Sequence, residues 1–189
     1  MGAWGITAFE SDAGLDAVEF IRHNPPENGE LELGKILNEM RHNEMALTED
    51  ASNGISHTGI MALAEIIMTF LDGNAGDLDY DEEWAAEDNK FAAVTKITAD
   101  VNSIALIRDY LQLTLESAIE NAVVRKQYAT TEWDKQGGWR TEKDWFGWQE
   151  HMTGLMNKLD EIMPDGLELV ELVKPQTIEQ VLPDEPGMG

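Results

Sequence analysis

Apolar residues recur at steps of three and four along most of this 189-residue chain, and that spacing predicts α-helices. The first expected helix covers residues 13–23 and ends before two consecutive prolines, because proline cannot continue a helix. A second covers residues 30–47. A third covers residues 57–71 and is apolar nearly all round, which is typical of a helix at the centre of a domain.

Two longer segments complete the helical pattern. Residues 90–129 are expected to be helical with a break near residues 99–102, and residues 145–162 carry a regular apolar seam. Thr141 and Asp144 resemble a capping box before that last helix, with Asp in place of the usual Glu. Residues 167–173 fit either a short strand or a final helical turn.

Together these patterns predict an all-α fold, a single-domain helical bundle of five or six helices. The expected domain is residues 1–174, including an N-terminal anchor segment, and the Pro- and Gly-rich residues 175–189 are expected to form a tail. In the anchor, Trp4 and Phe9 would close one end of the bundle, and Ser11 and Asp12 offer N-cap residues for the first helix.

Composition restricts the classes of function. The chain has 37 Asp and Glu against 13 Lys and Arg, a formal net charge of −24, which disfavours contact with a nucleic-acid backbone. It has no cysteine, so thiolate metal sites, cysteine nucleophiles and disulfides are excluded. Because no signal peptide or membrane-length apolar run is visible, we expect a cytoplasmic protein that does not bind a membrane.

The acidic residues gather in one stretch that lacks basic residues. No Lys or Arg occurs from His42 through Asn89, and two aromatic residues lie where the acids are densest. Aromatic side chains anchor protein interfaces and complementary charge speeds association, so the stretch predicts a site for a basic protein partner. A solvated surface that keeps the protein soluble is the alternative. The candidate partner-binding residues are Asp77, Asp79, Tyr80, Asp81, Glu82, Glu83 and Trp84.

Residues 125–143 run against this trend, with five basic residues against three acidic ones and with Trp133 and Trp139 between them. Basic residues interleaved with aromatic ones can stack on nucleobases. The negative field of the whole molecule opposes that use. We therefore expect a loop that packs its Trp residues on the bundle, or a second edge for protein contact.

Four residues are candidates for a divalent metal site. Glu39 and His42 have the i, i+3 spacing of di-iron bundles, and Glu19 and His23 lie one turn apart on another expected helix. Exposed histidines are the alternative, since the second Glu-x-x-His motif of a di-iron site is absent from the sequence. Motifs for nucleophilic catalysis, phosphate loops and dinucleotides are absent too, so we predict no catalytic residues and no other cofactor.

The N-terminus has an unusual pattern of glycine, aromatic and acidic residues, made by Gly2, Trp4, Gly5, Phe9, Asp12 and Asp16. This pattern resembles the start of a known bacterial family, domain of unknown function 4259. Where members often have a Gly-rich step, this chain has Ile6-Thr7-Ala8. The resemblance implies a small, largely helical bacterial or phage protein, and it brings no activity and no site residues.

Three functions follow as hypotheses. The first is an acidic protein-binding module, such as an immunity, inhibitor or counter-defence protein that engages a basic partner. The second is a metal-binding helical-bundle enzyme. The third is an oligomerising structural protein in which the seam of residues 145–162 forms a homodimer.

Overall fold

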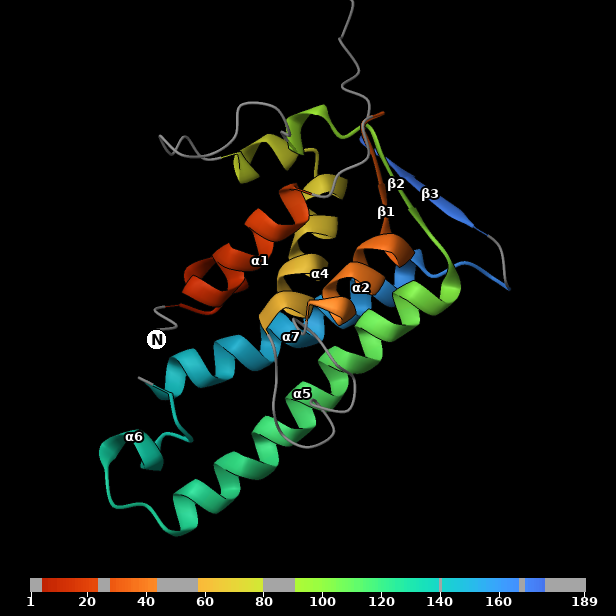
Figure 1. The fold of residues 1–189 in the computed structure, drawn as a ribbon. Coiled ribbons are helices and arrows are strands. Elements are labelled where there is room, and N and C mark those ends of the chain that lie inside the picture. The colour runs from red at the N-terminus through yellow and green to blue at the C-terminus, as the bar shows by residue number, and fades with distance from the viewer. Residues whose placement is uncertain are drawn as a thin grey trace, which may run out of the picture.

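The computed structural model describes residues 5–23, 28–43, 58–79, 91–139, 141–166 and 169–175, and these form a mainly helical fold with one small sheet (Figure 1). The α-helices are α1 (Asp12–Arg22), α2 (Leu33–His42), α4 (Thr58–Leu71), α5 (Val101–Gln127), α6 (Glu132–Lys135) and α7 (Glu142–Ile162). The strands are β1 (Glu30–Glu32), β2 (Lys96–Ala99) and β3 (Val170–Val173). The short 3-10 helices are η1 (Ala8–Glu10), η2 (Ala75–Leu78) and η3 (Phe91–Ala93). The predicted all-α class is confirmed, with a small sheet added.

Helix α4 lies at the centre of the bundle, as its apolar sequence predicts (Figure 1). Ten of its 14 residues are buried. It packs against α1, α5 and α7 and against the 3-10 helices η1 and η2. Burial of each large side chain, such as Ile60 or Phe70, contributes about 1.5–3 kcal/mol of transfer free energy. The core therefore forms around α4, and the other helices cover it.

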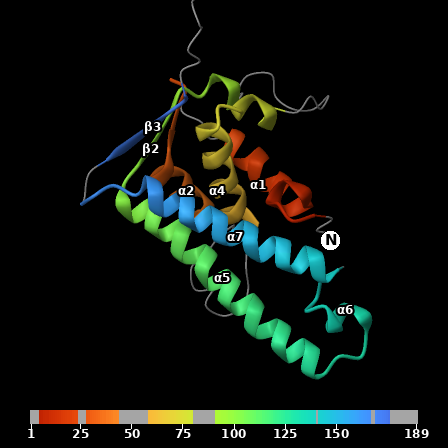
Figure 2. The same ribbon diagram turned by 180° about the vertical axis from the view of Figure 1, so that it is seen from behind.

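Helices α5 and α7 run antiparallel and pack through facing apolar seams (Figure 2). On α7 the predicted seam is buried at Trp145, Trp148, Met152, Leu155 and Leu159. Helix α5 has 27 residues, a length of about 40 Å, whereas α7 has 21. The C-terminal end of α5 therefore extends past the other helices to α6 (Figures 1 and 2).

The sheet joins three segments that are far apart in the sequence. β1 pairs with β2 in parallel, with Leu31 opposite Ile97, and β2 pairs with β3 antiparallel, with Ile97 opposite Leu172. The three paired side chains are buried. On the middle strand, the Lys96 Nζ lies 3.3 Å from a carboxylate oxygen of Glu30 and 3.1 Å from one of Glu171. Cross-strand apolar and charge pairs of this kind stabilise a sheet.

This sheet corrects two of the predicted helices. The helix expected over residues 30–47 begins only at Leu33, because residues 30–32 form β1. The helix expected from residue 90 begins at Val101, because η3 and β2 come first. The predicted break near residues 99–102 is confirmed at Asp100, whose side chain caps α5. Residues 170–173 form a strand, the first of the two predicted alternatives.

Side-chain caps start the first and last helices. On α1 the cap is Ser11, one of the two predicted N-cap residues, whose Oγ accepts the N–H of Gly14, and the other, Asp12, is the first residue of the helix. On α7 the Thr141 Oγ1 accepts the N–H of Asp144 at 3.0 Å and donates to the Asp144 carboxylate at 2.7 Å. The predicted Thr–Asp cap is thus confirmed.

Within the described part of the chain, no helix has both the length and the apolar character to cross a membrane. The most apolar helix, α4, has only 14 residues and contains the buried Glu65.

The contact of α1 with the N-terminal turn depends on a glycine. A Cβ on Gly14 would overlap the carbonyl group of Ala8. We expect Gly14→Ala to lower the free energy of unfolding by about 1–3 kcal/mol, because the turn must move away from the helix. The matched control is Gly154→Ala on α7, where a Cβ meets nothing within 4 Å and should add about 0.5–1 kcal/mol of stability. Urea unfolding measures both, and shifts of the same sign and size would contradict the assignment.

Candidate functional site: a tryptophan-lined pocket beside the N-terminal turn

Three tryptophans form a cluster at the N-terminal end of α7. Trp145 and Trp148 lie three residues apart on one face of the helix, and their ring centroids are 5.7 Å apart in a stacked arrangement. Trp139 comes from the loop after α6, with its centroid 5.5 Å from that of Trp148 and 6.2 Å from that of Trp145. Aromatic pairs at these separations attract each other beyond their burial. The prediction that the loop packs its tryptophan on the bundle is confirmed for Trp139.

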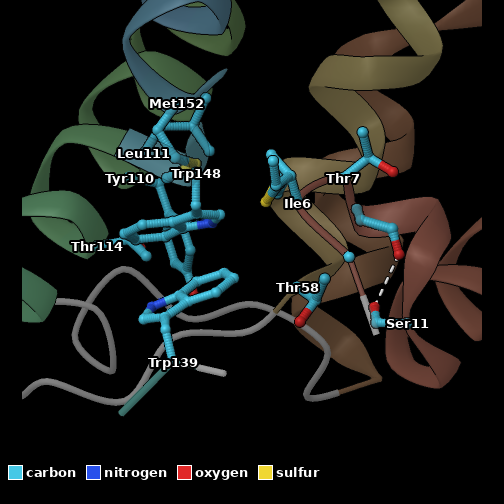
Figure 3. A pocket seen from close by; sticks show the side chains of 13 residues that line it. Ile6, Thr7, Ser11, Thr58, Tyr110, Leu111, Thr114, Trp139, Trp148 and Met152 are labelled. Carbon is cyan, nitrogen blue, oxygen red and sulfur yellow. Dashed lines mark hydrogen bonds between the residues drawn. The ribbon is translucent and has the colours of Figure 1, made fainter. Parts of the chain in front are cut away.

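A pocket of about 200 Å³ separates this cluster from the N-terminal turn (Figure 3). Trp139 and Trp148 form one wall, and Ile6 and Thr7 of the turn face them from the other side. Helix α5 contributes Tyr110, Leu111 and Thr114, and helices α4 and α7 contribute Thr58, Met61 and Met152.

The pocket suits a small apolar molecule. None of the residues that line it is charged, and its polar side-chain groups are hydroxyls and the indole N–H groups of the tryptophans. One of the hydroxyls, that of Ser11, is engaged within the turn, because its Oγ donates to the carbonyl of Ala8 at 2.7 Å. A cavity of this volume accommodates a molecule about the size of one aromatic ring. The lining offers shape, apolar contact and a few neutral polar groups.

A buried carboxylate holds the turn that forms the second wall. Glu65 lies in the apolar helix α4 and is only 4% exposed. Its oxygens accept the N–H of Ala8 at 2.9 and 3.1 Å, and one of them lies 2.6 Å from Nε2 of His151 on α7. Glu65 therefore joins three elements. A buried charge is costly unless it is paired and hydrogen-bonded, and Glu65 has both kinds of partner.

The turn is closed by two further contacts. The Glu10 carboxylate accepts the N–H groups of Ile6 at 2.8 Å and Thr7 at 3.0 Å. The hydrogen bond from the Thr7 N–H is the main cause that lowers the pKa of Glu10 from its ordinary value of 4.5. On the other side, Gly147 lets the Ile6 side chain approach α7, since a Cβ there would lie 2.6 Å from Ile6 Cδ1.

The His151 ring contacts Glu65, and among the residues that the structure describes no hydroxyl group hydrogen-bonds to His151. The sequence did not lead us to predict that Glu65 and His151 contact each other. The available signal was Glu65 itself, a lone acid inside an otherwise apolar helix. Its partner is 86 residues away, so no local pattern connects them.

The predicted partner-binding residues fall partly outside the described residues, which do not include Tyr80, Asp81, Glu82, Glu83 and Trp84. Of the other two, Asp77 is exposed on η2. Asp79 has an internal role, because its carboxylate accepts the N–H groups of Phe91 at 2.7 Å and Ala92 at 2.8 Å. It lies 4.0 Å from Nε of the buried Arg22 and fastens η2 to η3. The assignment of a partner to this stretch stays a prediction.

Three of the four candidate metal ligands, Glu19, His23 and His42, have side chains that contact groups of their own helices, whereas the contact of Glu39 is made by its main-chain carbonyl. On α1, a Glu19 carboxylate oxygen accepts from Arg22 at 3.0 Å, and His23 Nδ1 lies 2.8 Å from the Glu19 carbonyl oxygen. On α2, His42 Nδ1 lies 2.8 Å from the Asn38 carbonyl oxygen, and the Glu39 carbonyl accepts from the Asn43 side chain. Within the described residues, no three His, Asp or Glu side chains are grouped to hold a metal. The metal assignment also stays a prediction.

The comparison with known proteins covers most of the chain, including the pocket beside the N-terminal turn. The family model described as domain of unknown function (DUF4259) matches residues 2–151. The chain belongs to this family. The predicted family is therefore confirmed, and the DUF4259 match covers every residue that lines the pocket except Met152. No curated protein and no solved structure matches the chain.

The role of Glu65 can be tested by removing its charge or its oxygens. We expect Glu65→Leu to lower the free energy of unfolding by about 2–4 kcal/mol, because Ala8 N–H and His151 lose a buried acceptor. Glu65→Gln keeps an oxygen for Ala8 and should cost about 1 kcal/mol. Urea unfolding measures both. If Glu65→Leu is as stable as the parent protein, the Glu65–His151 pair makes no net contribution to the free energy of unfolding.

The turn should also respond to acid through Glu10. Because the folded pKa lies below the unfolded value, ionised Glu10 stabilises the fold above about pH 4.5, and this contribution is lost as the pH falls through the folded pKa. We expect Glu10→Gln to be less stable than the parent near pH 6 and to match it more closely at about pH 3. Urea unfolding across this range is the measurement. A difference that stays constant with pH would contradict the assignment.

Proposed function

We propose that this DUF4259 protein is a protein-binding module whose partner has a basic surface. An immunity, inhibitor or counter-defence protein that neutralises a basic enzyme is the role of this kind that the charge favours, and we place it in the cytoplasm. The net charge of −24 would attract such a partner over long range and speed association. The observation that supports the proposal is an exposed apolar stripe with acidic flanks on α5.

The stripe lies on the outer face of α5. Glu116, Ile119, Glu120 and Val123 follow one another at steps of three, one and three, which places them side by side on a helix. Ile119 is 40% exposed and Val123 is 63% exposed. The opposite face of the helix, at Ala118 and Ala122, packs inward. The outer face therefore carries apolar side chains that the fold itself does not use.

Two further apolar side chains are exposed near the C-terminal end of α5. Val124, in the last turn, is 55% exposed, and Tyr128, the C-cap, is 71% exposed. This end of the helix extends past the bundle (Figure 2). Aromatic and aliphatic groups that project in this way are typical of the centre of a protein interface. When a partner covers these side chains, the free energy falls, because apolar surface is removed from water.

The charges beside the stripe favour a basic partner over a second copy of the chain. Glu116 and Glu120 flank Ile119 and Val123, and Lys126 lies one turn after Val123, so the rim of the stripe carries two acids and one base. Two copies docked through this face would bring four carboxylates together, against the repulsion of two chains of charge −24. The nearby Arg125 contacts the α6 side instead, because a Cβ on Gly138 would lie 2.8 Å from its Nη1.

The test is a pair of substitutions that add the same charge to two helices. Val123→Lys lies in the stripe, and Thr153→Lys lies on an exposed face of α7. We expect the protein to capture a basic partner from native cells, and Val123→Lys to weaken the purified complex by at least about tenfold. The control should change the affinity less than about twofold.

The ionic strength provides a second readout. Association should slow steeply between about 50 mM and about 300 mM salt, because screening removes the long-range attraction. A partner that is acidic, a complex that Val123→Lys leaves unchanged, or a stable homodimer in light scattering would each contradict the proposal.

A further inference from the structure

We infer that a second pocket, on the side of Trp139 that faces α5 and α6, binds a small anion with a planar ring, such as an aromatic carboxylate. The pocket has a volume of about 310 Å³. It shares Thr114 and Trp139, both labelled in Figure 3, with the first pocket. Its other walls come from α5, from Trp133 of α6 and from Trp145 of α7.

The floor of the pocket is a single stripe of α5. Thr114, Ala118, Asn121 and Arg125 lie four, three and four residues apart, so they share one helical face. From Thr114 to Arg125 the helix rises by about 16 Å. The stripe places a hydroxyl at one end, a guanidinium at the other, and a methyl group and an amide between them. An elongated ligand with one charged end fits this order of groups.

Three indole rings surround the floor. Trp139 and Trp145 belong to the packed cluster, whereas Trp133 is 51% exposed on α6. The turn that carries α6 back over α5 needs two glycines with positive φ, Gly137 at 70° and Gly138 at 90°. A Cβ on Gly137 would lie 2.9 Å from the Cβ of Ala122, so this turn lies close against the helix. Walls made of aromatic rings favour a ligand with a flat, apolar body.

The charge of the ligand follows from Arg125. Arg108 and Lys135 form ion pairs with carboxylates, whereas Arg125 forms none with any described residue. Other described cations, such as Lys126, also lack an ion pair with these residues, and Arg125 differs from them in lining the pocket. The nearby acids are engaged elsewhere, since Glu132 pairs with Lys135 and Asp134 accepts from Thr131. A guanidinium beside aromatic walls is a planar donor for a carboxylate.

At the far end of the floor lies a buried hydroxyl. Thr114 Oγ1 is shielded from the pocket surface and has no hydrogen-bond partner among the described residues. The polar contact expected for the ligand is therefore the one with Arg125. The site does not depend on the proposed protein partner, because Ile119 and Val123 lie on the outer face of α5 and the pocket lies on the inner one.

The test uses two probes with the same ring, one with a charged carboxylate and the other with a neutral amide. 4-Fluorobenzoate and 4-fluorobenzamide have the same ring, and fluorine NMR follows their binding to the full chain without interference from tryptophan. We expect saturable binding of the benzoate and at least about tenfold weaker binding of the benzamide, because only the carboxylate pairs with Arg125. The absence of saturable binding up to about 10 mM, or equal binding of the two probes, would overturn the inference.

Matched substitutions locate the site. Arg125→Gln should weaken binding of the benzoate at least about tenfold, whereas Lys126→Gln, which removes the same charge outside the pocket lining, should change it less than about twofold. Trp133→Leu should weaken both probes. Arg125 and Trp133 are exposed, so all three variants should fold, which circular dichroism checks. Equal effects at Arg125 and Lys126, or binding that survives both Arg125→Gln and Trp133→Leu, would overturn the inference.

Discussion

The carboxylate of Glu65 is the interaction on which the arrangement of the pockets depends. It places a charge in the middle of the most apolar helix, where it accepts the N–H of Ala8 and pairs with His151. A carboxylate with 4% exposure needs these partners, so the N-terminal turn and α7 must both come to α4. The turn then faces the tryptophan cluster, and the space left between them is the first pocket.

A second constraint is the unequal length of the two antiparallel helices. Because α5 has 27 residues and α7 has 21, the last turns of α5 extend past the bundle and are covered on one side only. The inner side receives the α6 turn and the indole rings, and the outer side exposes Ile119 and Val123. One helix therefore carries two surfaces of different chemistry, an aromatic pocket with a cation and an apolar stripe with acids.

Local periodicity predicted the helices well where one face is buried against a neighbour. Residues 57–71 and 145–162 match α4 and most of α7, since a repeat of three and four residues is enough to specify such a face. The sheet was not predicted, because β1 and β2 are three and four residues long and pair across more than 60 positions. Strands this short have no period of their own, so only their partners identify them.

By itself, the sequence determined the helical class, the net charge of −24, the absence of thiol chemistry and membership of the DUF4259 family. These are properties of composition and of local pattern. Tertiary structure alone decided that Asp79 is used internally, that Glu65 meets His151, and that Arg125, which has no ion pair among the described residues, lies in one pocket with three tryptophans. Each of these facts depends on which distant residue lies within a few ångströms, and contacts of that kind arise only when the chain packs.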